Sequence, residues 1–216
     1  MLAGLLIDHD GTLVDSEPCQ FKIWQKILTD FGIDYHFNDF IPRIGIPGNV
    51  TAGYLVGHYQ LDISSAELAM IKEQATNDFL LNQSFPLMPG IAELLNWAKS
   101  KQLKLAIVSG AERASVLRSL ALNEIDHMID LVVAGDDVEH CKPAPDAYLS
   151  ALEQLSLTPE QVVAIEDSAS GIQSAKAAGL TCLAIKHSFT TPDKLTLADQ
   201  SFSHHLNILR HLAQQF

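Results

Sequence analysis

The sequence has few basic residues, few cysteines and no long hydrophobic run. Lysine and arginine number 14 against 26 aspartate and glutamate, which gives the 216 residues a formal net charge of −12. Nucleic acids and anionic membranes bind basic surfaces, so this balance argues against both as partners. It also means that an anionic substrate would need a local positive centre to overcome the acidic field of the protein.

The three cysteines, Cys19, Cys141 and Cys182, form no C-x-x-C pair and match no zinc-site spacing. We therefore expect reduced thiols. The N-terminal segment has no basic start, and acidic residues interrupt its apolar run by position 8, so it does not resemble a signal peptide. No stretch reaches the roughly 18 apolar residues of a membrane span. These absences predict a cytoplasmic protein, and the lack of an obvious second apolar seam favours a monomer.

Short apolar runs alternate with helical patterns through most of the chain. Strands are expected at residues 2–7, 103–108, 131–134, 162–165 and 180–185. This alternation predicts an α/β fold with a doubly wound, parallel, Rossmann-like sheet. The segment from about residue 15 to 82, between the first two of these strands, is helical without an obvious strand. Ser64 with Glu67 forms a capping-box signature within it. We expect residues 1–14 and 84–216 to form the core and residues 15–83 to form an inserted helical domain.

Polar residues follow the predicted strands, where ligands bind in sheets of this kind. Four of the strands or the loops after them contribute to this group: Asp8 and Asp10 after the first, Ser109 and Gly110 after the second, Lys142 after the third, and Glu166 and Asp167 after the fourth. Converging carboxylates stay ionised together only around a cation. Oxygen ligands without histidine or cysteine nearby select Mg²⁺ or Ca²⁺, and a small site with room for water and phosphate favours Mg²⁺.

Asp8 and Asp10 have the spacing of two side chains on one face of an extended chain. One carboxylate can attack phosphorus while the other transfers a proton. Ser109, with the backbone amides of Gly110 and Ala111, lies between a strand and a helix start, where an anion is favoured. Lys142 would neutralise the charge of the transition state.

Each of these features alone has an ordinary structural explanation. A D-x-D pair is usually a turn, Ser-Gly after a strand is usually a turn, and acids before a helix often only favour its N-terminus. The features gain weight together because all of them fall at strand ends of one sheet and have complementary chemical roles.

Four stretches carry a family resemblance: IDHDGTLVDSEP, IVSGA, CKPAPDAY and AIEDSASGIQSAKAAGL. The chain resembles the haloacid dehalogenase superfamily, in its phosphatase and phosphomutase branch with a helical cap. The resemblance implies that Asp8 is the nucleophile and Asp10 the general acid/base. It implies that Asp8, the carbonyl of Asp10 and Asp167 bind Mg²⁺ with Glu166 assisting, that Ser109 and Lys142 bind the phosphoryl group, and that the segment 15–83 is a mobile cap.

The positions around these motifs refine the expectation. Asp10 favours phosphoryl transfer, because dehalogenases of the superfamily lack this second aspartate. His9 occupies a position that is usually apolar, and we expect its side chain to point away from Asp8 and Asp10, as a structural or surface residue. Gln20 replaces a histidine typical of β-phosphoglucomutases, which favours hydrolysis. Gln20 and Arg43 are candidate substrate contacts from the cap.

The sequence therefore predicts a Mg²⁺-dependent phosphatase that acts on small phosphorylated metabolites, such as sugar or polyol phosphates. A phosphomutase resembling β-phosphoglucomutase is the alternative, since it would use the same aspartyl-phosphate. A catalytically silent binding module is a third hypothesis, against which the intact acidic and basic set speaks. The pair His204–His205 has no acidic or cysteine neighbours, and we expect it at a solvated helix end.

Overall fold

The computed structural model describes residues 1–81, 83–187 and 195–215. The chain divides into two compact units, one formed by Met1–Asp15 and Pro86–Phe216 and the other by Ser16–Phe85. We call them the core unit and the helical unit. The catalytic and cap roles predicted for these parts of the chain remain predictions.

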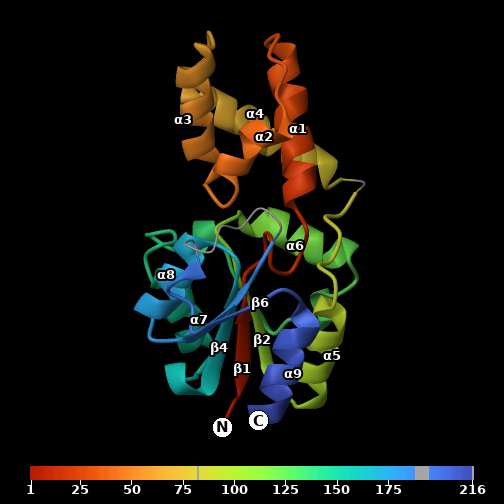
Figure 1. Cartoon of the computed structure of the whole chain (residues 1–216), viewed down its shortest axis with the longest axis vertical. Helices are drawn as coiled ribbons and strands as arrows, with labels where there is room; N and C mark the ends of the chain where they lie inside the picture. Colours follow the sequence, from red (N-terminus) through yellow and green to blue (C-terminus); the bar gives the residue numbers. More distant parts are fainter. Residues whose placement is uncertain (82, 188–194, 216) are drawn as a thin grey trace. The chain divides into compact units, whose positions relative to one another are not determined.

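A six-stranded parallel sheet forms the centre of the core unit (Figure 1). Its order is β3-β2-β1-β4-β5-β6. The strands are β1 (Gly4–Ile7), β2 (Lys104–Val108), β3 (Leu131–Val133), β4 (Val162–Glu166), β5 (Thr181–Ile185) and β6 (Gln200–Phe202). The predicted α/β fold with a doubly wound parallel sheet is therefore confirmed.

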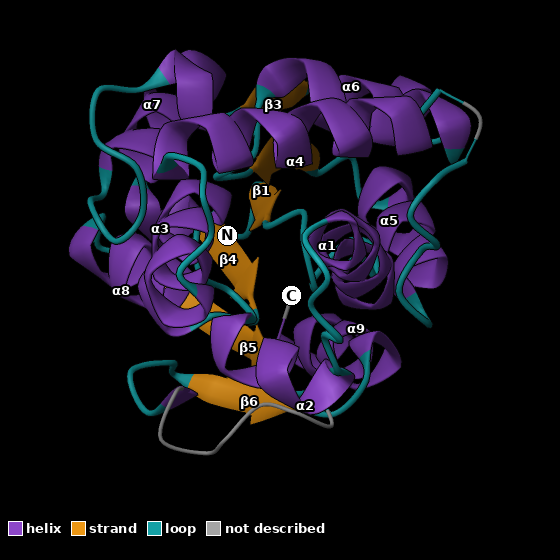
Figure 2. Cartoon of the chain, turned by 90° about the horizontal axis from the view of Figure 1, so that it is seen from above, coloured by secondary structure: helices purple, strands orange, loops and turns teal. Residues whose placement is uncertain are grey.

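Helices cover both faces of this sheet, with α7 and α8 on one side and α5 and α9 on the other (Figures 1 and 2). The helices of the core unit are α5 (Ile91–Ser100), α6 (Arg113–Leu122), α7 (Asp146–Leu155), α8 (Ala169–Ala177) and α9 (His205–Gln215). Short 3₁₀ turns lie at Asp126–Met128, Gly135–Asp137 and Pro159–Gln161.

Strand β1 lies in the middle of the sheet, between β2 and β4, and all four of its residues are buried. Leu6 packs with Ala106 of β2 and Ala164 of β4 in the cluster that α7 and α8 cover. Leu5 and Ile7, which alternate with it along the strand, are also fully buried. A strand buried on both faces reads as a continuous apolar run, which is why the sequence predicted it.

Two expectations at the C-terminal end were wrong. The sheet was expected to end with the strand at 180–185, but β6 pairs in parallel with β5 beyond it. Its residues, QSF, are mostly exposed, so this edge strand has no apolar run to reveal it. His205 was expected at a solvated helix end, yet it begins α9 and is only 1% exposed.

The helical unit contains α1 (Glu17–Asp30), α2 (Phe37–Phe40), α3 (Gly48–Tyr59) and α4 (Ser65–Phe79), with a 3₁₀ turn at Ile41–Arg43. Ser64 and Glu67 form the predicted capping box at the start of α4, with the Glu67 N–H donating to Ser64 Oγ at 3.2 Å. The unit has its own core, which includes Trp24, Leu55 and Leu68.

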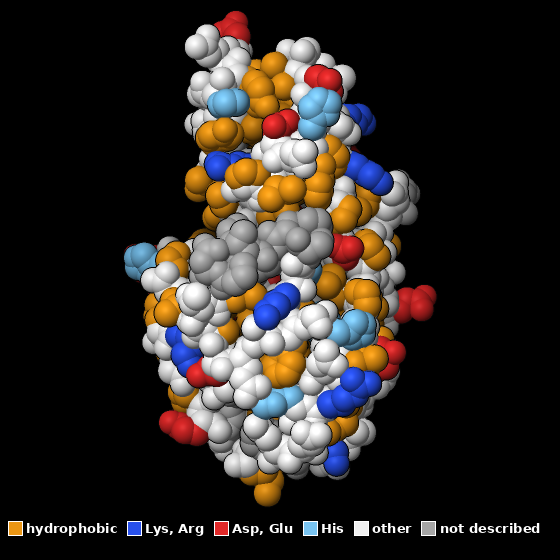
Figure 3. Space-filling view, in the orientation of Figure 1, with side chains coloured by type: hydrophobic (Ala, Val, Ile, Leu, Met, Phe, Trp, Pro, Cys, Tyr) orange, Lys and Arg blue, Asp and Glu red, His pale blue; other side chains and the backbone are white. Residues whose placement is uncertain are grey.

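None of the helices in the described ranges combines the length and the apolar character that a bilayer crossing requires. On the face drawn in Figure 3, lysine and arginine side chains lie scattered among acidic and uncharged ones.

Candidate active site

The register of the sheet brings predicted site residues together at the carboxyl ends of its strands, which we call the carboxyl edge of the sheet. Ile7 of β1 is level with Ile107 of β2 and with Ile165 of β4. Asp8 continues this pairing by donating its backbone N–H to the Ile165 carbonyl at 3.0 Å. Glu166 is the last residue of β4, so its side chain emerges beside Asp8 at the carboxyl edge of the sheet.

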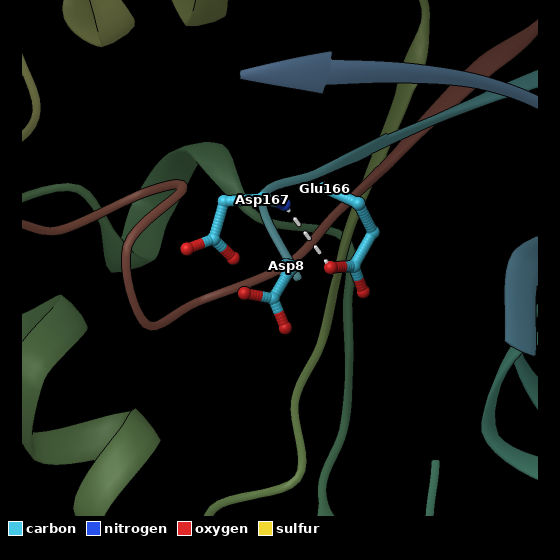
Figure 4. A group of neighbouring side chains, drawn as sticks. All are labelled: Asp8, Glu166 and Asp167. Atoms are coloured by element: carbon cyan, nitrogen blue, oxygen red, sulfur yellow. Dashed lines mark hydrogen bonds between the residues drawn. The ribbon is translucent and has the colours of Figure 1, made fainter. Parts of the chain in front are cut away.

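Three buried carboxylates form a group at this edge. Asp8, Glu166 and Asp167 each offer an oxygen within 4.8 Å of the others, and Figure 4 shows the carboxylates gathered together at the strand ends. Their exposed fractions are 7%, 0% and 8%. Burial raises the pKa of Asp8, and the nearby charge of Glu166 raises it further. Burial also raises the pKa of Asp167. The group therefore needs positive charge to stay fully ionised.

Lys142 supplies one positive charge to this group. Its ammonium donates to Asp8 Oδ1 at 2.6 Å, to Glu166 Oε1 at 2.6 Å and to the Val108 carbonyl at 2.9 Å, which uses all three of its donors. Burial acts to lower the pKa of Lys142, but the charges and hydrogen bonds of the two carboxylates outweigh it and raise that pKa. The lysine is therefore held as a cation against the Asp8 carboxylate.

Glu166 is held on both of its oxygens. Besides Lys142, Oε1 accepts from the Tyr148 hydroxyl at 2.8 Å. Oε2 accepts from the Asp167 N–H at 3.2 Å and from Ser168 Oγ at 3.3 Å. A Cβ on Gly171 in α8 would overlap the Glu166 carboxylate, so this position requires glycine. Glu166 thus anchors the lysine and the loop that carries Asp167.

Asp167 has partners from two other segments of the core unit. Thr12 Oγ1 donates to its Oδ1 at 3.4 Å, and His187 Nε2 lies 3.4 Å from its Oδ2. A Cβ on Gly11, whose φ is 76°, would overlap the same carboxylate. Burial acts to lower the pKa of His187, but Asp167 and the Gly11 carbonyl outweigh it and raise that pKa.

Sequence reasoning missed Tyr148, Thr12 and His187. His187 follows β5 by two residues, so the rule that drew attention to the other strand ends would also have found it here. Thr12 and Tyr148 lie inside the stretches DHDGTL and CKPAPDAY, but their roles as donors to Asp167 and Glu166 depend on contacts between segments that are far apart in the sequence.

The turn after β2 places Ser109 at the same edge. Ser109 is buried, and its Oγ accepts the Ala111 N–H at 3.0 Å, with exposed Gly110 between them. The hydroxyl keeps its own proton to donate. Arg113, at the start of α6, binds the Asp137 carboxylate at 2.9 and 2.6 Å. It is therefore a structural clamp rather than a group aimed at this site.

The expectation for His9 was wrong. Its side chain is 2% exposed, and its Nδ1 lies 3.1 Å from Asp10 Oδ2 instead of pointing away. The expectation assumed that strand alternation continues past residue 8. Strand β1 ends at Ile7, and the following residues form a turn in which the Leu13 N–H donates to the Asp8 carbonyl at 3.1 Å. The Asp10 side chain is 33% exposed.

Gln20 and Arg43, the two candidate substrate contacts, belong to the helical unit. Gln20 lies in α1. Arg43 lies in the 3₁₀ turn Ile41–Arg43, and its guanidinium is 4.1 Å from the centre of the Tyr54 ring. Their roles in substrate binding remain predictions.

The donor set of the carboxylate group fits a divalent cation. Asp8, Glu166 and Asp167 carry three negative charges when ionised, and Lys142 balances one of them. One divalent cation would neutralise the remaining pair. All three side chains offer oxygen, the ligand that Mg²⁺ prefers. The side chain of Asp10 lies outside this group, so any bond from Asp10 to the metal would come from its backbone carbonyl, as the sequence resemblance implied.

Comparison with known proteins decides the family. The sequence model of the haloacid dehalogenase-like hydrolases matches residues 5–185. The chain belongs to this family. The resemblance and the enzyme class predicted from the sequence are thereby confirmed.

Relatives of known name are similar to this chain over most of its length. It is 34% identical over 184 residues to the fructose-1-phosphate phosphatase YqaB of Escherichia coli, covering 85% of this chain and 96% of that one. It is 32% identical over 183 residues to a phosphorylated carbohydrates phosphatase of Thermotoga maritima, covering 83% and 82%. Among solved structures, CbbY from Rhodobacter sphaeroides in complex with phosphate matches with a TM-score of 0.82 and 26% identity, covering 94% and 95%.

Proposed function

We propose that this protein is a Mg²⁺-dependent phosphatase of small phosphorylated metabolites, with Asp8 as its nucleophile. The observation that carries the proposal is the buried Asp8 carboxylate, which faces the Lys142 ammonium at 2.6 Å and belongs to one group with Glu166 and Asp167. A carboxylate beside a fixed cation at a strand end is placed to attack phosphorus and to have the developing charge neutralised.

The chain's own residues divide the chemistry between them. Lys142 holds Asp8 Oδ1, so we assign Oδ2 as the oxygen that attacks the phosphorus atom. The ester P–O bond breaks as Asp10 protonates the leaving oxygen. Asp10 then removes a proton from water, whose oxygen attacks the phosphorus and breaks its bond to Asp8, releasing phosphate. Ser109 and the Gly110 amide would bind the phosphoryl oxygens. The Ala111 amide, predicted as a third donor, points to Ser109 Oγ in this structure and would have to turn from it to bind phosphate.

A bound Mg²⁺ would be held by Asp8, Asp167 and the Asp10 carbonyl, with Glu166 assisting, and would supply positive charge to the phosphoryl oxygens. Such a centre answers the difficulty that a protein with a net charge of −12 poses for an anionic substrate. Glu166 supports this centre indirectly, because its oxygens are bound to Lys142, Tyr148 and the loop of Asp167.

The substrate class we propose is sugar or polyol phosphates. The similarity to a fructose-1-phosphate phosphatase and to a phosphorylated carbohydrates phosphatase supports this class. Substrate selection would then fall to the helical unit acting as a cap, with Gln20 and Arg43 as the candidate contacts. Gln20 also favours hydrolysis over transfer of the phosphoryl group to a second hydroxyl of the sugar.

Phosphorus NMR on a panel of sugar phosphates with Mg²⁺ tests the reaction. Free phosphate as the product supports the proposal, whereas an isomeric sugar phosphate would identify a mutase. Asp8→Asn should abolish turnover while the protein stays folded, and chelation of Mg²⁺ should do the same. Asp34→Asn is the matched control, since the Asp34 side chain is 87% exposed in the helical unit. Near-full activity of the Asp8→Asn protein, with deamidation excluded, would refute the assignment.

A further inference from the structure

His9 links the proposed acid/base residue to a helix far away in the sequence. Its imidazole is buried, with Nδ1 3.1 Å from Asp10 Oδ2 and Nε2 3.0 Å from Ser119 Oγ. Ser119 lies in α6 and is fully buried. Both ring nitrogens therefore have a partner, and one partner is a carboxylate that reaches solvent with 33% of its side chain exposed.

The hydrogen-bond chemistry fixes the direction of this chain of three residues. An ionised carboxylate can only accept, so Nδ1 carries a proton and donates to Asp10 Oδ2. In the neutral imidazole, Nε2 is then the acceptor, and the Ser119 hydroxyl donates to it. Helix α6 thus fixes the position of Ser119, and the Ser119 hydroxyl fixes the orientation of the His9 ring. The ring in turn fixes the position of Asp10 Oδ2.

We propose that His9 is a positioning residue that holds the Asp10 carboxyl group in the orientation needed for proton transfer. The proposal rests on the proposed function, in which Asp10 protonates the leaving oxygen. With Oδ2 bound to the His9 N–H, Oδ1 is the oxygen that gives and takes the proton. The terminal torsion of an aspartate is broad, so a partly exposed carboxyl group without such a bond samples many orientations. Correct orientation of the acid/base group raises the rate of proton transfer by a large factor.

Three variants separate positioning from packing. His9→Phe keeps an aromatic ring but removes both hydrogen bonds. His9→Asn retains a donor near the position of Nδ1 and loses the contact with Ser119. Ser119→Ala keeps the imidazole and removes the group that orients it. The readout is kcat/KM for two esters, an alkyl phosphate that needs a proton on its leaving oxygen and p-nitrophenyl phosphate that does not.

We expect His9→Phe to lower kcat/KM for the alkyl phosphate by about 10- to 100-fold, the scale of lost orientation in catalysis. Turnover of p-nitrophenyl phosphate should change by less than about threefold, because proton donation contributes little to a good leaving group. His9→Asn should recover most of the loss, and Ser119→Ala should fall between Asn and Phe. In an Asp10→Asn background, His9→Phe should add no further loss for the alkyl ester.

Several results would overturn the proposal. Equal losses for both esters would assign His9 a purely structural role, as would an additive loss in the Asp10→Asn background. Unchanged alkyl phosphatase activity in His9→Phe would remove the role altogether. If His9→Phe fails to fold, the ester ratio of Ser119→Ala decides alone, and an unchanged ratio rejects the proposal. Failure of the proposed function is distinguishable, because the wild-type protein would then turn over neither ester with Mg²⁺.

Discussion

Mild acid should destabilise the core unit through His205, the first residue of α9. The His205 side chain is 1% exposed. Burial lowers the pKa of its imidazole to about 4, and the backbone carbonyls of Pro89 and Thr12 offset this effect only in part. The folded protein therefore keeps His205 neutral at pH values where an unfolded chain would protonate it.

The sign and size of the effect follow from this difference. In the unfolded chain the pKa of histidine is about 6.5, so between pH 4 and 6.5 the unfolded state binds more protons and stability falls as the pH falls. The whole shift corresponds to about 3 kcal/mol, of which about 2 kcal/mol is lost between about pH 7.5 and about pH 5. Burial raises the pKa of Asp8 and Asp167, which act in the opposite direction, so only a comparison with a His205 variant isolates this residue.

The measurement uses the fluorescence of Trp97, one of the two tryptophans of the chain. Trp24 lies in α1 of the helical unit, whereas Trp97 lies in α5, which packs against α9. In a Trp24→Phe background, urea unfolding followed by fluorescence reports on the core unit. His205→Phe should lose about 2 kcal/mol less than the parent protein between the two pH values. Replacing exposed His127 by Phe is the control and should leave the pH dependence unchanged. A His205→Phe protein that loses as much stability as its parent would refute the reasoning.

Two further predictions concern the carboxylate group. Gly171→Ala should lower the free energy of unfolding of the core unit by about 1–3 kcal/mol, because the new methyl group overlaps the fixed Glu166 carboxylate. Gly57→Ala is the control: this position in α3 has open space around it, so the change should be neutral or stabilising by up to about 1 kcal/mol. Equal effects in thermal unfolding would contradict this. His187→Asn should weaken Mg²⁺ binding about 10- to 100-fold in calorimetry, because His187 orients Asp167. Exposed His140→Asn should bind Mg²⁺ as the wild type does, and an unchanged affinity in His187→Asn would exclude the role.

Buried strands could be predicted from the sequence because they consist of consecutive apolar residues. Strand β1 is buried on both faces, so the apolar run of residues 2–7 was enough to predict it, and the end of that run pointed to Asp8. The edge strand β6 is short and mostly exposed, so it left no such signal. A polar edge strand is defined by hydrogen bonds to its neighbour, and those bonds depend on the path of the chain rather than on local composition.

Residues that act through other residues were harder to predict than those at strand ends. Asp8 and Glu166 follow or end a strand, so topology alone brings them together. The partner of His9 is Ser119, which is 110 residues away, and no local pattern pairs them. The contact between Arg43 and Tyr54 was equally hard to predict, because it depends on how the turn at Ile41–Arg43 packs against α3. Such contacts are specified by tertiary packing.

Three of the nine histidines surround the turn formed by residues 8–14, which carries both proposed catalytic aspartates. His9 ties this turn to α6 through Ser119. The Gly11 carbonyl of the turn raises the pKa of His187, which follows β5, and the Thr12 carbonyl acts in the same direction on the pKa of His205, which begins α9. Catalytic groups on a turn are less precisely placed than groups on a helix or strand, and they depend on the residues that support them. Each of these histidines belongs to, or lies against, a different element of the core unit. The apolar fold places Asp8 at the carboxyl end of the central strand. Buried polar contacts of this kind would fix the orientation of the turn that follows it.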